Sequence, residues 1–114
     1  MKIWLDDKRQ APEGWRLAKT ASAAIGLLKK CKVTDISLDH DLGEGNGTGN
    51  DVLLWIEAAT FMKNDYIPPK ITIHSANVSA ANKMRLGAER IEKEARGRKR
   101  NVKLCRNRIK KNSQ

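Results

Sequence analysis

The chain has 114 residues and a formal net charge of +10, so it is long enough for one domain with a modest core and too short for two. It has no run of 18 apolar residues, and charged residues follow almost directly on the N-terminus, which argues against a membrane span and a signal peptide and favours a cytoplasmic protein without a membrane partner. Cys31 and Cys105 stand alone, without the close spacing of zinc ligands, which argues against a zinc site or a disulfide framework.

The N-terminal third alternates between strand and helix patterns. Residues 2–6 predict a strand, and after a polar loop residues 15–19 predict a second, shorter one. Thr20 or Ser22 caps a helix whose apolar residues recur at i, i+3, i+4 and i+7 spacing and which ends at a pair of lysines. Residues 36–39 then predict a buried strand.

A glycine-rich loop follows this strand. Residues 43–50 hold four glycines, which suits a segment that moves or lies close to a ligand. Asn50 or Asp51 caps a second helix with an apolar stripe, and a Pro-Pro pair precedes a strand at residues 70–74. A helix between two strands predicts a parallel crossover.

The C-terminal part of the chain predicts one more helix. Residues 79–96 have the spacing of a basic amphipathic helix, and beyond it the alternation of Val102 and Leu104 predicts a last edge strand followed by a mobile tail. We therefore expect the domain at residues 1–96 and a basic extension at residues 97–114.

The positive charge is concentrated in this C-terminal part. Residues 83–114 carry 13 Lys or Arg against three Glu, which accounts for the whole net charge, whereas residues 1–82 are neutral. Such a segment is typical of a surface that binds the phosphates of nucleic acid, although a solvated surface that only aids solubility is the alternative. The side chains expected to contact nucleic acid are Arg90, Arg96, Arg98, Lys99, Arg100, Lys103, Arg106 and Arg108.

Carboxylates follow the first and third predicted strands. Ligands of open α/β sheets bind outside the carboxyl ends of the strands, so the polar segments there are expected to converge. Crowded carboxylates repel one another unless a hard cation lies between them, and Mg²⁺ prefers one or two carboxylates together with water and phosphate oxygens. A divalent cation, Mg²⁺ or Mn²⁺, is therefore expected; the alternative is that the first two acids only cap a turn. The expected ligands are Asp6, Asp7, Asp39 and Asp41.

Both histidines of the chain, His40 and His74, lie in the same strand-end segments. An imidazole near its reference pKa accepts and returns a proton at neutral pH, so both are candidates for acid and base catalysis. The alternative is that one of them is a hydrogen-bonded core residue, or a ligand for a transition metal beside Asp41.

Three further polar residues are candidates for phosphate binding. The guanidinium fork of Arg9 matches two phosphate oxygens, although an exposed loop arginine is the alternative. Ser75 and Asn77 are expected to donate hydrogen bonds to a phosphate or to orient the histidines, and Asn77 equally suits a cap of the helix that follows it.

Four motifs carry a family resemblance. They are Asp-Asp-Lys-Arg (6–9), Ser-Leu-Asp-His-Asp-Leu-Gly (37–43), Gly-x-Gly-x-Asp-Val-Leu-Leu-Trp-Ile (47–56) and His-Ser-Ala-Asn (74–77). The order of elements resembles the receiver (CheY-like) fold of response regulators, and the motifs are similar to those of the small cyclic-phosphate processing receiver-like family over roughly residues 1–95. The resemblance implies an α/β fold of the flavodoxin-like type, with three layers: a compact parallel sheet and helices on both faces.

The resemblance also implies roles for single residues. Asp6 and Asp7 match the positions at which receivers hold Mg²⁺, Asp39 matches the phospho-acceptor, and Ser75 matches the switch residue. The chain departs from an ordinary receiver in its two histidines, in the arginine after the acidic pair and in lacking a clear Lys-Pro pair in the last strand. These departures argue against a phospho-relay.

Together, the residues and the resemblance predict a phosphoesterase that processes cyclic phosphate, with Asp39, His40 and His74 as catalytic residues. RNA ends are the expected substrate, and a cyclic nucleotide or a nucleotide-sugar cyclic phosphate is the alternative. One histidine would activate water and the other would protonate the leaving ribose oxygen. Arg9 would clamp the phosphate and the basic end of the chain would hold the RNA backbone. Two alternatives remain: a non-enzymatic module that binds metal and nucleic acid, and a phosphorylation-controlled switch.

Overall fold

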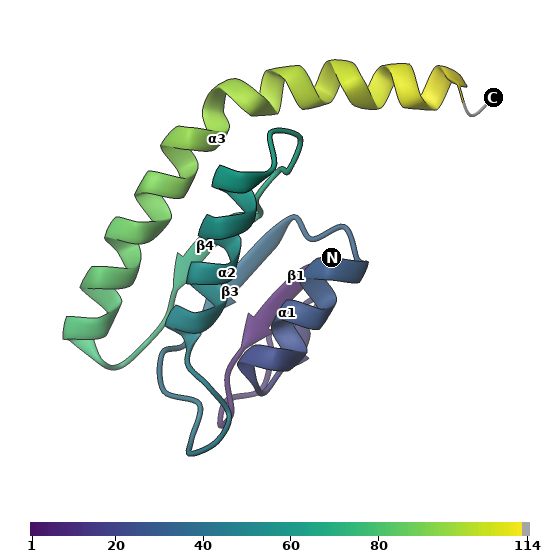
Figure 1. Ribbon diagram of the computed structural model, residues 1–114. Coiled ribbons are helices and arrows are strands. Elements are labelled where there is room, and N and C mark those ends of the chain that lie inside the picture. Colours follow the sequence, from purple (N-terminus) through teal and green to yellow (C-terminus); the bar gives the residue numbers. More distant parts are fainter. Residues whose placement is uncertain (113–114) are drawn as a thin grey trace.

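The computed structural model describes the backbone of residues 1–112 and the side chains of residues 1–96. Four strands form one sheet in the order β2-β1-β3-β4, and every neighbouring pair is parallel (Figure 1). The elements in chain order are β1 (Lys2–Leu5), β2 (Arg16–Ala18), α1 (Ala21–Lys30), β3 (Asp35–Leu38), α2 (Gly49–Met62), β4 (Lys70–Ile73) and α3 (Val78–Asn112). The parallel crossovers predicted from the sequence are confirmed.

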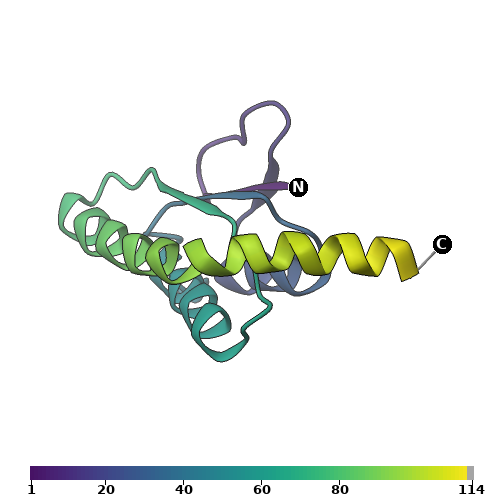
Figure 2. The same cartoon turned by 90° about the horizontal axis from the view of Figure 1, so that it is seen from above.

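The helices gather on one face of the sheet. The β2-α1-β3 and β3-α2-β4 connections advance in the same direction along the sheet, and right-handed crossovers of this kind place both helices on the same side. Helix α3 packs against α2 and β4. Figure 2 shows the loop of residues 6–15 on the opposite side. The receiver-like α/β class is confirmed, but the expectation of helices on both faces is wrong, because an irregular loop joins β1 to β2 where a helix would cover the second face.

The strand register decides which side chains face the helices. Ile3, Ile36 and Ile71 form one rung across the sheet, and Leu5, Leu38 and Ile73 form the second rung after it. These residues point toward the helices, and the four on β1 and β3 are fully buried. Side chains of the rung between them, Trp4, Ser37 and Thr72, point the other way because neighbouring residues of a strand alternate. We call the side that carries this rung the open face.

Side chains cap the beginnings of all three helices. Oγ1 of Thr20 accepts a hydrogen bond from the Ala23 amide at 3.0 Å, as predicted. Helix α2 is capped by Thr48, whose Oγ1 accepts from the Asp51 amide while Oδ2 of Asp51 accepts from the Thr48 amide. The expectation that Asn50 or Asp51 is the cap is therefore wrong: Asp51 is the third residue of a capping box, in which it supports the cap from inside the first turn.

Helix α3 is longer than the sequence suggested. The edge strand expected around Val102 and Leu104 is wrong, because these residues continue α3. Arg and Lys, which dominate this stretch, favour a helix, and two alternating apolar residues are too short a pattern to overcome that preference. Figure 1 shows that α3 begins beside the carboxyl ends of the strands and runs away from them, so that its C-terminal part lies beyond their amino ends. Among the described residues, no helix is sufficiently long and apolar to cross a membrane.

Tyr66, the chain's single tyrosine, gives a pH-dependent test of its own packing against Trp55 of α2. Its ring contacts Trp55 edge to face at a centroid distance of 6.1 Å, and burial raises its pKa to about 12 from an ordinary value of 10.0. Because the pKa is raised in the folded state, its contribution to stability is complete below about pH 10 and is lost as the pH rises through about 12. We expect tyrosinate absorbance of the native chain to appear near pH 12, and that of the urea-unfolded chain near pH 10. Coincident titrations would contradict the burial of Tyr66.

Candidate functional site

Three polar residues form the next rung beyond the strand ends. The Asp39 amide donates to the Leu5 carbonyl oxygen at 3.0 Å, and the His74 amide donates to that of Leu38 at 2.9 Å, so the ladder continues one residue past each strand. Asp6 directly follows β1 at the same level. Each of the three lies two residues after a member of the rung Trp4, Ser37 and Thr72. Their side chains therefore point to the open face as well. One ligand atom from each of Asp6, Asp39 and His74 lies within 4.8 Å of the other two. We call these three residues the carboxyl-edge cluster.

Asp6 serves both the turn and the cluster. Its Oδ1 accepts hydrogen bonds from the amides of Lys8 and Arg9 at 2.9 and 3.0 Å, which is the turn-capping role considered above. Its Oδ2 lies 3.1 Å from Nε2 of His74. Burial alone would raise the pKa of Asp6, but the two amides and His74 outweigh it, and the pKa lies below its ordinary value. Asp6 is therefore an ionised carboxylate with one oxygen directed at the cluster.

His74 is fixed by three neighbours. Its ring stacks on Trp4 at a centroid distance of 3.9 Å and an angle of 5°, and its side chain is 13% exposed. Nδ1 lies 2.7 Å from Oγ of Ser37, and Nε2 faces Asp6. Burial lowers the pKa of His74 more strongly than the carboxylates of Asp6 and Asp39 raise it. The imidazole is therefore neutral at neutral pH, and both of its nitrogens have protein partners.

Asp7 has a buried carboxylate oxygen, Oδ1, without a hydrogen-bond partner among the described residues. A buried carboxylate oxygen without a donor is costly unless a cation neutralises it. The glycine-rich loop passes close by, because a Cβ atom built on Gly43 would lie 3.5 Å from Oδ2 of Asp7. The cluster's carboxylate and imidazole donors fit a divalent cation, whereas Asp7 lies outside the cluster, although its oxygen also lacks a positive partner.

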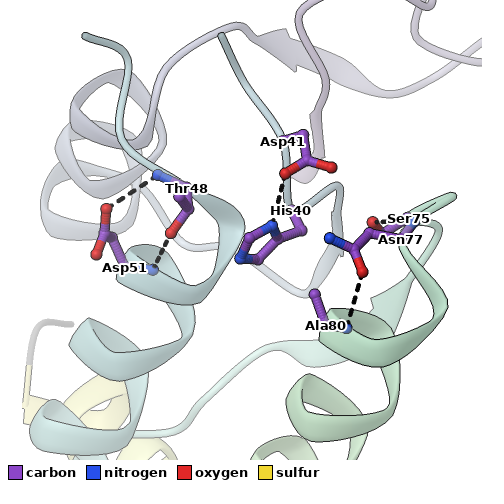
Figure 3. A network of polar contacts seen from close by, with 7 residues as sticks. All are labelled: His40, Asp41, Thr48, Asp51, Ser75, Asn77 and Ala80. Carbon is purple, nitrogen blue, oxygen red and sulfur yellow. Dashed lines mark hydrogen bonds and ion pairs between the residues drawn. The ribbon is translucent and has the colours of Figure 1, made fainter. Parts of the chain in front are cut away.

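His40 lies apart from this cluster, in a cleft between two helices. Figure 3 shows its ring between the first turn of α2, marked by Thr48 and Asp51, and the start of α3. Its Nδ1 lies 2.8 Å from Oδ1 of Asp41, a side chain that is 67% exposed and does not belong to the cluster. The cleft has a volume of about 430 Å³ and is lined by His40, Asn50, Asn77, Ser79, Ala80, Lys83 and Met84. The two histidines thus have different surroundings: His74 touches the carboxylates, and His40 faces the cleft.

Of the residues expected to bind phosphate, Arg9 lies near the cluster, and Ser75 and Asn77 lie at the start of α3 beside the cleft. Oγ of Ser75 accepts from the Asn77 amide at 3.1 Å, and Oδ1 of Asn77 accepts from the Ala80 amide at 3.1 Å, so Asn77 caps α3 (Figure 3). Arg9 is exposed and lies close enough to the cluster that its charge, after the larger effect of burial, also lowers the pKa of His74. Arg9 is therefore available to an incoming anion, while Ser75 and Asn77 shape the turn that ends at the cleft.

Two residues at the site were missed by sequence reasoning. A serine within a buried strand does not by itself indicate a functional role, so the sequence pattern assigns none to Ser37. A usable signal was its position two residues before Asp39, which places both on the same side of β3. Lys83 was counted only as part of a basic helix, and its place in the cleft depends on how α3 docks.

The structure describes only two of the side chains expected to contact nucleic acid. Arg90 lies 3.3 Å from Glu57 of α2, and Arg96 lies 3.8 Å from Glu92 one helical turn earlier. Both guanidinium groups are largely exposed. The remaining ones, Arg98, Lys99, Arg100, Lys103, Arg106 and Arg108, lie outside the described side chains.

Comparison with known families adds an independent observation. Residues 1–90 match the model of the family described as cyclic-phosphate processing receiver domain. The matched segment contains the carboxyl-edge cluster, Arg9, and the cleft around His40. No curated protein and no solved structure gave a significant match to the chain.

Proposed function

This chain belongs to the cyclic-phosphate processing receiver domain family, and we propose that it is a phosphoesterase that opens the 2′,3′-cyclic phosphate at RNA ends. The observation that carries this proposal is the meeting of Asp6, Asp39 and His74 at the carboxyl edge of the sheet. Parallel α/β sheets bind their ligands at this edge. A cluster of negative charge beside exposed basic groups suits a substrate phosphate bound through a cation.

A divalent cation would be held by Asp6 and Asp39, whereas Asp7 lies outside the group of ligand atoms. Such a cation would supply neutralisation of charge on the phosphate oxygens. Asp41 is not assigned to this site, because its carboxylate is exposed and pairs with His40. Arg9, which is exposed and close enough to affect the pKa of His74, would bind a phosphate oxygen.

His40 is the better of the two histidines for proton transfer. It is accessible from the cleft, and Asp41 orients its ring through the contact with Nδ1. His74 is less suited, because Ser37 and Asp6 occupy its two nitrogens. In ring opening, a water oxygen bonds to phosphorus and its proton passes to His40. One P–O bond to the ribose breaks, and the leaving oxygen takes a proton from solvent, which yields a terminal phosphomonoester.

RNA is proposed as the substrate class because a 2′,3′-cyclic phosphate is a product of RNA cleavage and the chain carries a net charge of +10. Lys83 is the basic residue of the cleft itself, so it would contact the nucleotide at the RNA end. Helix α3 leads from this cleft toward the basic C-terminal segment (Figure 1). An RNA strand that follows α3 would therefore meet increasing positive charge with distance from its reacting end.

The decisive experiment is turnover of an RNA oligonucleotide that ends in 2′,3′-cyclic phosphate, with and without Mg²⁺ or Mn²⁺. We expect ring opening by the native chain and a loss of about 100-fold or more in kcat for His40→Ala, the size of effect typical of a general base. The same RNA with a linear 3′-phosphate serves as the substrate control and should remain unchanged. Turnover that survives His40→Ala would remove His40 from the mechanism. An inactive native chain that still binds RNA in a salt-sensitive manner would favour the non-enzymatic binding module.

A further inference from the structure

The position of Ser37 suggests a role that is separate from packing. It is 3% exposed and lies on β3, between Trp4 of β1 and Thr72 of β4 in the register. Its hydroxyl therefore lies on the open face beneath the ring of His74, at 2.7 Å from Nδ1. The opposite ring nitrogen faces the carboxylates. Ser37 thus determines which nitrogen of His74 is presented to the cluster.

We propose that Ser37 is a positioning residue that holds His74 as a nitrogen ligand for a transition-metal ion, through Nε2 and beside the carboxylates of Asp6 and Asp39. This inference deepens the proposed function, because it concerns the same cluster. It specifies a donor set of one imidazole nitrogen and two carboxylates, which suits Mn²⁺ or Zn²⁺ better than Mg²⁺, an ion that prefers oxygen. His74 thereby acquires a role that is distinct from acid and base catalysis.

The chemistry of the hydroxyl explains why a serine fits this position. Without a metal ion, the ionised Asp6 accepts a hydrogen bond from the Nε2–H group of His74, so Nδ1 carries no proton and accepts a hydrogen bond from Oγ of Ser37. A nitrogen that coordinates a cation carries no proton, so the ring proton then lies on Nδ1 and is donated to the same Oγ. A hydroxyl both donates and accepts, and Ser37 therefore serves both states without moving.

The surroundings keep the ring from turning away. The parallel stack on Trp4 fixes the plane of the imidazole, and Trp15 contacts Trp4 edge to face at 6.0 Å. With the ring plane fixed, the ring can still turn over by about 180° about the last side-chain bond, and the hydrogen bond to Ser37 selects one of these two orientations. Preorganisation of this kind is what the partner of a ligating histidine supplies, and its removal typically lowers metal affinity 10- to 100-fold.

Calorimetric titration of the full chain with Mn²⁺ and, separately, Mg²⁺ tests the proposal. We expect Ser37→Ala to weaken Mn²⁺ binding about 10- to 100-fold and Ser37→Thr, which keeps the hydroxyl, to restore most of it. Thr72→Ala is the matched control, because it removes a hydroxyl from the same rung without contacting His74, and its Mn²⁺ affinity should equal that of the native chain. His74→Ala should abolish the preference for Mn²⁺ over Mg²⁺. Native Mn²⁺ affinity in Ser37→Ala, or an unchanged preference in His74→Ala, would overturn the proposal.

A second measurement uses only the native chain and so does not depend on any variant folding. Nitrogen-15 spectra of the imidazoles report which ring nitrogen carries the proton, and only two histidines need to be assigned. We expect the proton of His74 on Nε2 in the metal-free chain and on Nδ1 after saturation with Zn²⁺. A His74 proton that stays on Nε2 would overturn the proposal. That result would leave turnover of cyclic phosphate, tested with His40→Ala, as a separate question.

Discussion

Replacement of Asp39 by Asn is expected to lower kcat/KM for cyclic-phosphate opening by about 100-fold or more, the loss typical when a group that stabilises transition-state charge is removed. Asn keeps the size of the side chain and removes its charge. A carboxylate oxygen of Asp39 lies within 4.8 Å of a ligand atom of Asp6 and of His74, so metal binding should weaken in parallel. Stability should be unchanged or slightly higher, because the variant relieves repulsion between neighbouring carboxylates. Activity, metal affinity and urea unfolding measured on the same preparations would show whether activity and metal affinity fall while stability does not.

Asp35→Asn provides the matched control for this prediction. Asp35 begins β3 and Asp39 directly follows its end, and the even spacing of the two puts their side chains on the same face. The variant makes the same change of charge and size away from the proposed site, and its turnover and metal affinity should equal those of the native chain. Equal losses in the two variants would mean that the overall charge of the strand matters rather than the cluster. Full activity of Asp39→Asn would remove the cluster from the mechanism.

The sequence predicted the order of elements well, because each strand and helix has a local pattern. It also contained the reason for the one-sided arrangement of helices: the segment between the first two strands is short and holds Pro12 and Gly14, which leaves no room for a helix. The family resemblance nevertheless led to the expectation of helices on both faces. Here the local pattern was the better guide.

The partners of His74 could not be predicted in the same way. Its bond to Ser37 requires that β3 and β4 pair in one particular register, and that the ladder continues one residue past each strand. Both depend on how the strands pair in the folded chain, which no local sequence pattern specifies. The cap of α2 illustrates a smaller limit, because Thr48, Asn50 and Asp51 are all good capping residues and only the position of the loop distinguishes them. Sequence therefore predicted which residues lie near the site better than it predicted their roles.

Replacement of Gly49 by Ala is expected to have the largest effect on stability. Gly49 begins α2, and its amide donates to the carbonyl oxygen of His40 at 3.1 Å. A Cβ atom here would overlap the carbonyl oxygen of Asp39 and approach the end of the Met84 side chain to 3.0 Å. Backbone yields less readily than a side chain, so we expect a loss of about 3 kcal/mol in the free energy of unfolding. For a chain of this size, that corresponds to a fall of roughly 10 °C in Tm.

Gly26→Ala makes the same chemical change with the opposite expected sign. Gly26 lies inside α1, and a Cβ atom there would meet nothing within 4 Å. Alanine in a helix interior is favoured over glycine by about 0.5 to 1 kcal/mol, so this variant should unfold at a higher urea concentration than the native chain. Because the obstructed atom in Gly49→Ala belongs to Asp39, folded molecules of that variant should also bind Mn²⁺ more weakly, whereas Gly26→Ala should bind it normally. A Gly49→Ala chain as stable as the native one would mean that α2 does not press against the strand end that carries Asp39, and the cleft around His40 would then lie elsewhere relative to the cluster.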